Sequence, residues 1–431
     1  MSINIPVCRQ PRNILTGCQN CSMLLKLGDK QYIELVKNLG FNLITCWKLG
    51  AGARLITEFQ ENGIKVETEH SGHCEYDKII KDVKDAQSIN IDGKVENVIN
   101  PGHRGVIFDK MLSDVEDYAK LGFSGLAIDD EYYSDWRGML VDMSDNTKKQ
   151  WTEWMRVNYP ELKVVMPEII LDDPINHLKE YNAWWLFRMS LMTEWYAEVR
   201  KRFVNQAIKH TGKGSEKPWM SAQIGRPVMS KGKTDLYNYN KLLEVFDYFS
   251  PQLYMNAYEI RGQVADLVRV VGKEKALPLL CMGEARANRD QWKKGEVKAQ
   301  ILEILFAGAK GYGSWGWPYS NLRIIAEFAQ TNNVIAENED IFVHGEKTNS
   351  FYVEDQVRQF ASTLETDKAG LLLISNYTQT GEDEVMVRKF IRKNIELREV
   401  FTGNKIILAE GQEVFIVNIK PGTCALYRWN K

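Results

Sequence analysis

Three consecutive carboxylates follow a short apolar run in the first half of the chain. The run begins at Gly125 and is followed by Asp129, Asp130 and Glu131, with two tyrosines directly after them. Adjacent carboxylates repel one another unless a bound group or a proton uses them. A buried strand that ends in polar side chains is how a parallel-sheet protein presents its chemistry. This stretch therefore predicts reactive groups at the end of a strand.

A second glutamate ends another apolar run, 276–283, and is Glu284. A retaining glycosidase needs one carboxylic acid that protonates the leaving oxygen and one carboxylate that attacks the anomeric carbon, about 5–5.5 Å apart. Glu131 and Glu284 are therefore the candidate catalytic pair, if the fold brings these two strand ends together.

Aromatic and hydrogen-bonding side chains stand at the other expected strand ends. The chain holds 12 tryptophans and 18 tyrosines, and flat apolar rings suit the apolar faces of sugars. The candidate substrate-binding residues are Trp47, His70, Asp129, Asp130, Arg226, Tyr254, Trp315 and Trp317.

Short apolar runs and amphipathic helical segments alternate through most of the chain. The expected strands are 13–17, 41–47, 64–70, 125–128, 218–224, 247–254, 276–284 and 311–317. Each is followed by a helical pattern, and eight strand–helix pairs in a row indicate a (β/α)8 TIM barrel, placed here at 1–345 as the catalytic domain. Residues 346–431 change to short alternating strands with turn residues between them, which is typical of an antiparallel β-sandwich domain.

Two segments interrupt the regular alternation. Residues 71–104 have the composition of a long loop over the barrel mouth. The segment 183–207 is expected to be helical and contains Trp184, Trp185, Trp195 and Tyr196. Because these rings recur at helical spacing, we expect them to pack and not to bind ligand.

The strand ends resemble the clan A glycoside hydrolases, whose acid/base glutamate ends strand four and whose nucleophile ends strand seven. Residues 147–159 and 306–317 are also similar to family 42 β-galactosidase-like enzymes, as a pattern over 13–331 and without close identity. The resemblance implies that Glu131 is the acid/base, Glu284 the nucleophile, Tyr254 a residue that orients the nucleophile and Trp315 a sugar-stacking platform.

Asp130 departs from that family pattern, which usually has asparagine before the acid/base. An amide both donates and accepts, whereas an ionised carboxylate only accepts, so the bound sugar or the family differs. Two alternatives stay open. In clan D barrels an aspartate ending strand four is the nucleophile, which would be Asp129 or Asp130 here. The chain could also be a carbohydrate-binding barrel without catalysis.

Cysteine, histidine and arginine residues suggest other possible sites, for a metal, for redox chemistry or for an anion. Cys18 and Cys21 form a single pair without a second, which disfavours zinc or redox chemistry. His70 is followed by His73 and Cys74, yet we expect His70 to contact sugar. Arg104 and Arg226 could hold an anionic group such as a uronate or a sulfate, or pair with the acids beside Glu131.

The composition excludes several partner classes. A net charge of −2 argues against nucleic acid and anionic membranes, and no apolar run approaches the roughly 20 residues needed to span a bilayer. Motifs for phosphate loops, serine hydrolases and zincins are absent, so we expect no cofactor and no metal. The start lacks a signal peptide as given, although a removed signal would leave no trace. We expect a carbohydrate substrate and consider a homo-oligomer.

Overall fold

The computed structural model describes most of the chain. The described residues are 8–19, 28–47, 52–72, 76, 78–129, 142–210, 217–223, 238–281, 294–316, 322–354, 358–379, 381 and 383–431.

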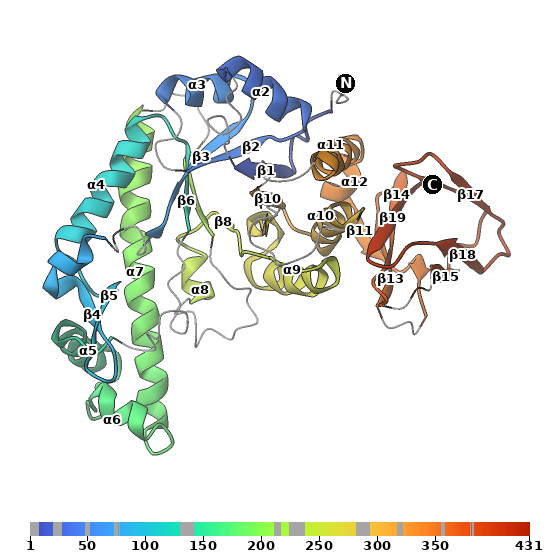
Figure 1. The fold of residues 1–431 in the computed structure, drawn as a ribbon. Helices are drawn as coiled ribbons and strands as arrows, with labels where there is room; N and C mark the ends of the chain where they lie inside the picture. Colours follow the sequence, from blue (N-terminus) through green and yellow to red (C-terminus); the bar gives the residue numbers. More distant parts are fainter. Residues whose placement is uncertain are drawn as a thin grey trace. The chain divides into compact units, whose positions relative to one another are not determined.

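Eight parallel strands alternate with helices along the described part of the chain (Figure 1). The strands are β1 (Leu15–Gln19), β2 (Leu43–Trp47), β3 (Lys65–His70), β6 (Gly125–Ile128), β7 (Trp219–Ala222), β8 (Tyr248–Phe249), β9 (Leu279–Cys281) and β10 (Gly311–Trp315). The helices are α2 (Asp29–Asn38), α3 (Ala53–Glu61), α4 (Val106–Lys120), α5 (Asp145–Asn158), α6 (Pro167–Asp172), α7 (Leu178–His210), α8 (Tyr239–Leu242), α9 (Ala257–Val271), α10 (Glu296–Ala307), α11 (Leu322–Glu337) and α12 (Glu339–His344). This alternation confirms the predicted fold class.

The chain forms two compact units, each of which contains parallel strands. The first unit comprises Met1–Thr45, Glu58–Lys65 and Gln252–Lys431, and the second comprises Cys46–Thr57 and Val66–Pro251. The hydrogen-bonded strand order is β2-β1-β10-β9 in the first unit and β8-β7-β6-β3 in the second. The domain boundary placed between residues 345 and 346 stays a prediction.

The segment 71–104 is not the plain loop that its composition suggested. It contains an antiparallel pair, β4 (Gln87–Ile89) with β5 (Val95–Ile99), after two short 3₁₀ turns. The turn between these strands is held by the Asn90 side chain, which accepts two backbone N–H groups, and by Gly93 at φ +79°. The prediction was wrong here because each strand is too short to show alternation against a charged background.

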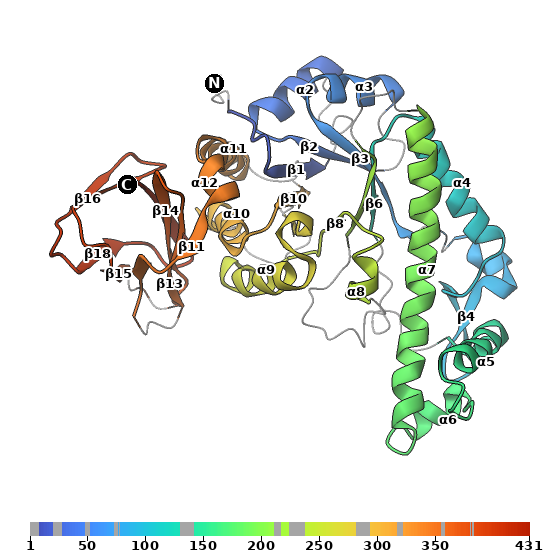
Figure 2. The same cartoon turned by 180° about the vertical axis from the view of Figure 1, so that it is seen from behind.

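The helix α7 is the longest helix among the described residues. Its 33 residues correspond to a length of about 50 Å at 1.5 Å per residue. It runs beside α4 in both views (Figures 1 and 2), and the rings of Phe108 and Trp195 are 4.5 Å apart at this contact. Trp184, Trp195 and Tyr196 are fully buried, which confirms that the aromatic residues of this helix pack.

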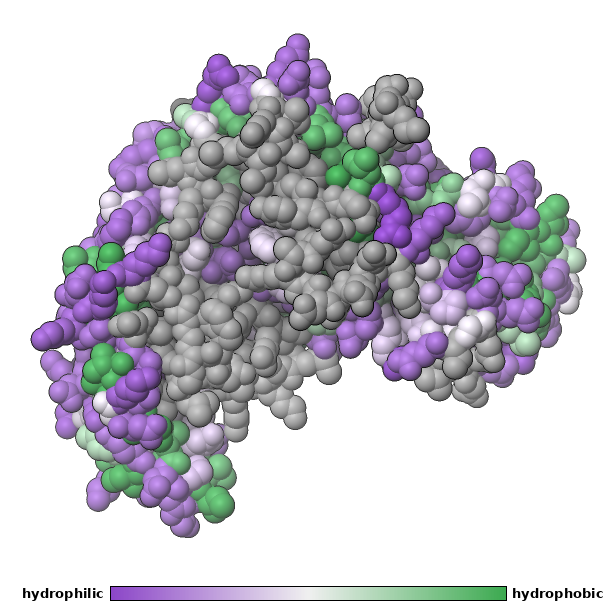
Figure 3. Space-filling view, viewed as in Figure 1, coloured by the Kyte–Doolittle hydropathy of each residue, from purple (hydrophilic) through white to green (hydrophobic). Residues whose placement is uncertain are grey.

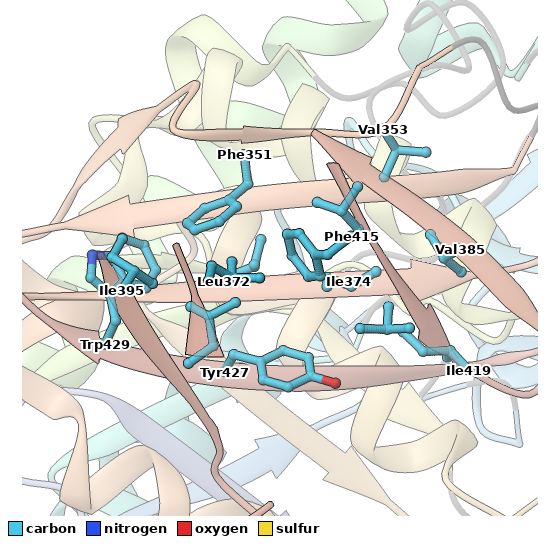
Figure 4. Close-up of a cluster of buried hydrophobic side chains, with 14 residues drawn as sticks. Phe351, Val353, Leu372, Ile374, Val385, Ile395, Phe415, Ile419, Tyr427 and Trp429 are labelled. Atoms are coloured by element: carbon cyan, nitrogen blue, oxygen red, sulfur yellow. The ribbon is translucent and has the colours of Figure 1, made fainter. Parts of the chain in front are cut away.

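Two antiparallel sheets form the predicted C-terminal sandwich. Their strands are β11 (Glu346–Thr348), β12 (Phe351–Tyr352), β13 (Gln359–Glu365), β14 (Ala369–Asn376), β15 (Glu384–Lys389), β16 (Ile395–Glu399), β17 (Lys405–Leu408), β18 (Val414–Asn418) and β19 (Thr423–Asn430). The six-stranded sheet has the order β11-β13-β14-β19-β16-β17, and the three-stranded sheet is β12-β15-β18. Figure 4 shows the core between them, where Phe351, Leu372, Phe415 and Trp429 meet.

The six-stranded sheet is covered on both faces. In β14, Leu372 and Ile374 belong to the core between the two sheets, whereas Leu371 and Leu373 pack with apolar residues of α10, α11 and α12. Successive side chains of a strand point to opposite faces, so a continuous apolar run is what a strand buried on both sides requires. The sandwich is therefore anchored to the helices that follow the last parallel strands.

The outer surface of the sandwich exposes several large apolar side chains. These exposed residues include Tyr352, Met386, Phe390 and Ile416. Figure 3 shows apolar patches on the surface of the sandwich. Met386 and Ile416 face each other across β15 and β18. The homo-oligomer that we considered from the sequence stays a prediction.

A glycine on β6 leaves space for a tryptophan of the neighbouring strand. A Cβ atom at Gly125 would lie 2.3 Å from the Trp219 ring. We expect Gly125→Ala to lower the free energy of unfolding by about 1–3 kcal/mol through overpacking, as measured by urea unfolding. The control Gly262→Ala, where nothing lies within 4 Å of the added Cβ, is expected to stabilise helix α9 by about 0.5–1 kcal/mol. Equal midpoints for the two variants would contradict this packing.

Candidate functional site

The structure describes only part of the predicted site. The predicted residues outside the described part of the chain are Asp130, Glu131, Arg226, Glu284 and Trp317. The side chains of His70, Asp129, Tyr254 and Trp315 are described, and Trp47 is described as the last residue of β2.

One face of the sheet in the second unit carries buried polar groups. Glu67 of β3 is paired in register with Gly125 of β6, which is paired with Trp219 of β7. The indole Nε1 of Trp219 and the hydroxyl of Ser221 both donate to Glu67 Oε2, at 3.2 and 3.0 Å. The missing side chain at Gly125 therefore lets two strands share one buried carboxylate across the strand between them.

The same face continues toward the carboxyl ends of the strands. By the two-residue alternation of a strand, Glu69 of β3 lies one step beyond Glu67, and Asp129 and Gln223 extend β6 and β7 on this face. The ladder persists this far, because Asp129 N donates to the His70 carbonyl and Gln223 N to the Ile128 carbonyl, both at 2.8 Å. Three of the acids near the end of the sheet, Glu67, Glu69 and Asp129, thus share one face.

Sequence reasoning selected Asp129 and missed both glutamates of β3. Glu67 and Glu69 are 3% and 6% exposed. The signal was visible, because the run 65–70 places glutamate at alternate positions of a strand that was predicted to be buried. Glu67 serves the packing of Trp219, whereas Glu69 is the more exposed of the two and lies nearer to the strand end.

His70 is engaged within the protein through both ring nitrogens. Its Nδ1 accepts the Gly72 backbone N–H at 3.0 Å, so Nε2 carries the proton and donates to the Tyr76 hydroxyl at 3.1 Å. Tyr76 in turn donates to Asp114 Oδ2 at 3.0 Å. The ring is 1% exposed. The predicted contact of His70 with sugar stays a prediction, and the described contacts hold this ring in place within the protein.

In the first unit, Gln19 and Trp315 end neighbouring strands. Gln19 Oε1 accepts the Gly316 backbone N–H at 3.4 Å. Trp315 is paired in register with Cys281, the last residue of β9. Glu284 is three positions beyond Cys281 in the sequence. The half-buried Trp315 ring is therefore carried by the strand next to the one that leads to Glu284.

Tyr254 follows the last backbone pairing of its segment. Gln252 forms a parallel bridge with Leu279, and Leu253 N donates to the Leu279 carbonyl at 2.8 Å. Tyr254 comes immediately after this pairing and is half-buried. The segment that carries it thus lies beside the start of β9.

Arg104 contacts three backbone carbonyls of the described residues. Its Nη1 donates to the carbonyls of Pro101 and His103, at 2.8 and 3.0 Å, and its Nη2 donates to the Leu191 carbonyl at 3.3 Å. Among the described residues, its Nη2 is paired with the carboxylate of Glu194 on α7, at 3.9 Å. Arg104 therefore ties the start of α4 to α7, and its predicted role toward an anion or toward the acids beside Glu131 stays a prediction.

His103 makes the stability of this region sensitive to pH. Its ring is 3% exposed, and burial lowers the pKa of His103, opposed by Asp85. Because the unfolded chain takes up this proton near pH 6.5 and the folded chain resists it, the free energy of unfolding should fall as pH drops from 7 toward 5. The His103→Gln variant should show a flatter profile in urea titrations at several pH values. An unchanged slope would contradict the assignment.

The described part of the chain contains neither a cluster of metal ligands nor a helix that could span a membrane. No group of three or more histidine, cysteine, aspartate or glutamate side chains there is arranged to hold a metal ion. Cys18 is buried in β1, and Cys21 lies outside the described residues. None of the described helices has both the length and the apolar character needed to cross a membrane.

No protein-family model and no curated protein matches the sequence. Solved structures do match. A β-galactosidase from Bacillus circulans sp. alkalophilus has a TM-score of 0.68 at 7% identity and covers 99% of this chain and 100% of its own. A β-galactosidase from Rahnella sp. R3 has a TM-score of 0.56 at 13% identity, covering 80% of this chain and 59% of its own. An α-galactosidase from Mortierella vinacea has a TM-score of 0.51 at 7% identity, covering 100% and 98%. At such identities the likeness establishes the fold, which these glycoside hydrolases share.

Proposed function

We propose that this chain is a glycoside hydrolase that cleaves a β-linked glycoside or oligosaccharide with retention of configuration. The observation that carries the proposal is the likeness in fold to a β-galactosidase over 99% of the chain, on a barrel whose strand ends carry acids. Fold alone does not determine activity. The residues at the carboxyl ends of the strands supply the chemical part of the argument.

The proposed mechanism requires the two glutamates to be in different protonation states. Glu284, ionised, attacks the anomeric carbon, while Glu131 protonates the departing oxygen and later deprotonates the water that releases the sugar. Asp129 and Asp130 favour protonated Glu131, because neighbouring negative charges disfavour a further one. The two carboxyl groups need a separation of about 5–5.5 Å for this double displacement.

The remaining predicted residues are proposed to bind the sugar. Trp47, Trp315 and Trp317 provide aromatic walls, and Tyr254 orients Glu284. Asp130 accepts hydrogen bonds where the family 42 pattern has asparagine, so we expect a sugar that offers a hydroxyl donor at that position. His70 and Arg226 complete the predicted set.

A fluorinated glycoside tests the nucleophile directly. The protein is incubated with activated 2-deoxy-2-fluoro β-glycosides of galactose and glucose and, separately, with the α-linked galactose analogue, and peptic peptides are mapped by mass. A fluoroglycosyl ester on Glu284 is the expected result, because the fluorine slows the second step more than it prevents the first. A panel of aryl β-glycosides is assayed in parallel.

Two alternatives correspond to other outcomes of this experiment. Asp129 or Asp130 as the nucleophile, in the manner of clan D, is favoured by the fold likeness to an α-galactosidase, and label on either residue from the α-linked analogue would select it. A carbohydrate-binding barrel without catalysis would give no label and no turnover on any substrate of the panel.

A further inference from the structure

A cavity of about 410 Å³ lies between the start of α9 and the C-terminal sandwich. The side chains and turns that line it are Asn256, Ala257, Tyr258, Glu259, Glu296, Arg358, Tyr377, Thr378, Gln379, Pro421 and Gly422. Its volume falls within the roughly 300–1,000 Å³ range of small-molecule sites. All of these residues belong to the first unit, and none of them is in the predicted catalytic or substrate-binding set.

Arg358 occupies this cavity with a strained backbone. Its φ is +71°, and it is the one residue other than glycine in the described part of the chain with a positive φ. Its carbonyl accepts the Tyr377 backbone N–H at 2.7 Å. Left-handed backbone costs free energy for a residue with a side chain, and such strain persists mainly at functional positions. A glycine would fit the turn without this cost. The turn itself therefore does not explain the arginine, which points to a role for its side chain.

The Arg358 guanidinium ends a stack of rings and cations. Its Cζ lies 5.1 Å from the Tyr258 ring centroid, Tyr258 is stacked on Phe360 at 6.0 Å, and Arg261 lies over Phe360 at 4.6 Å. At the inner end, Arg261 is paired with Glu303 at 2.8 Å. Within the described residues, no hydrogen bond or ion pair involves the Arg358 guanidinium. The stack therefore holds the planar Arg358 guanidinium in place, while its N–H groups donate no hydrogen bond to the described residues.

The charges around the cavity select the kind of ligand. Within the described lining, the carboxylate of Glu259 accompanies the single cation Arg358, so these two residues carry no net positive charge that would favour an anion. Carboxylates accept hydroxyl protons, the guanidinium donates, and the amide of Gln379 does both. Tyr258 adds a ring that is 38% exposed. Donors, acceptors and an aromatic ring together suit a neutral polyhydroxylated ligand.

The cavity is on the side of the sheet where chemistry is expected. Asn256 is two residues beyond Tyr254, and Glu296 is the first residue of the helix that follows β9. Helices that follow parallel strands begin at the carboxyl ends of those strands, where the sites of (β/α)8 proteins lie. Figures 1 and 2 both show α9 beside the sandwich strand β13. The helices that carry Tyr258 and Glu296 thus begin on the side of the sheet from which a bound saccharide would extend.

We propose that this cavity is a second saccharide-binding site, in which Arg358 and Tyr258 hold a neutral sugar unit of an oligosaccharide. The proposal deepens the proposed function and gives the sandwich a role in substrate choice. It implies a preference for substrates of several units, because a single-unit glycoside cannot occupy both places.

Binding is measured separately from turnover. Wild type, Glu284→Gln and Arg358→Gly are tested by calorimetry and on an array against unbranched β-linked gluco-, galacto-, manno- and xylo-oligosaccharides of four to six units. Wild type and Glu284→Gln should bind the same saccharide. The affinity of Arg358→Gly for it should be lower by about tenfold or more, as expected when charge-assisted hydrogen bonds are lost. Since glycine relieves the strain at this position, the melting temperature of Arg358→Gly should be equal to wild type or higher.

Further variants isolate the site. Tyr258→Ala should also weaken binding, and Arg392→Gly, which removes an exposed guanidinium elsewhere on the sandwich, should leave it unchanged. If the chain hydrolyses glycosides, Arg358→Gly should raise KM for the oligosaccharide with kcat retained and leave single-unit aryl glycosides unaffected. Absence of hydrolysis would contradict the proposed function, but the saccharide affinities of wild type and Arg358→Gly could still be compared. Wild-type affinity in Arg358→Gly, or no saccharide bound by the wild type, would overturn the second site.

Discussion

Replacing Glu284 by glutamine is expected to lower kcat by about 10⁴-fold or more, the scale found when a nucleophile is removed. The amide keeps the size of the side chain but cannot attack the anomeric carbon. Initial rates with an activated aryl β-glycoside measure the loss. Glu274→Gln is the matched control, because Glu274 is an exposed residue paired with Lys310, and this variant should keep wild-type rates.

Glu131→Gln should show a different pattern of loss. Removing a general acid lowers turnover by about 10²–10⁴-fold, and least for substrates whose leaving group needs no proton. Azide should restore turnover of such an activated substrate, since it attacks the glycosyl-enzyme without a base. Full activity in either the Glu131 or the Glu284 variant would rule out the assigned pair.

Glu303→Ala is expected to lower the free energy of unfolding by about 3 kcal/mol, at the low end of the range for breaking a buried ion pair because Arg261 is partly exposed. Glu303 is fully buried on α10 and pairs with Arg261 Nη1 at 2.8 Å, where the arginine side chain is 32% exposed. It also accepts the hydroxyls of Ser375 and Tyr377, at 2.6 and 2.8 Å. Alanine leaves both hydroxyls of the sandwich without their acceptor.

Tyr377 shows why these hydrogen bonds persist over a wide pH range. Burial, with a further contribution from the Glu303 charge, raises the pKa of Tyr377 well above its usual value. The phenol therefore keeps its proton and donates at any pH at which the protein is handled.

Urea unfolding followed by tryptophan fluorescence measures the Glu303 effect. The control is Glu354→Ala, which breaks an exposed pair with Arg388 and is expected to cost about 0–1 kcal/mol. A double-mutant cycle between Glu303 and Arg261 should give a coupling energy that the exposed pair lacks. Similar losses for Glu303→Ala and Glu354→Ala would show that burial does not strengthen this contact.

The sequence predicted the long helices and strands of the fold better than the short elements between them. The apolar run 311–317 predicted β10, and the aromatic segment 183–207 predicted the greater part of α7. The pair β4 and β5 was missed because its order comes from the Asn90 turn and not from alternation. Local pattern determines long elements, whereas short ones depend on contacts that the sequence does not display.

The same limit applies to the candidate site. Asp129 was predicted from its position at a strand end, and the backbone ladder does carry it there. The roles of Glu67 and His70 depend on partners distant in sequence, Trp219 in one case and Asp114 through Tyr76 in the other. Such partners follow from the register between strands and from tertiary packing, which composition cannot give.

The length of α7 has a consequence for hydrogen exchange. Its first half packs with α5 and α6 around Trp151, and its second half packs on α4 and, through Tyr196, on Phe246. One continuous helix thus belongs to two separate apolar clusters. Opening of either cluster exposes only the amides of its own half, so the protection of backbone amides along α7 should fall into two segments with separate opening free energies. The change between them should fall near Leu191, where Arg104 is bonded to the helix backbone.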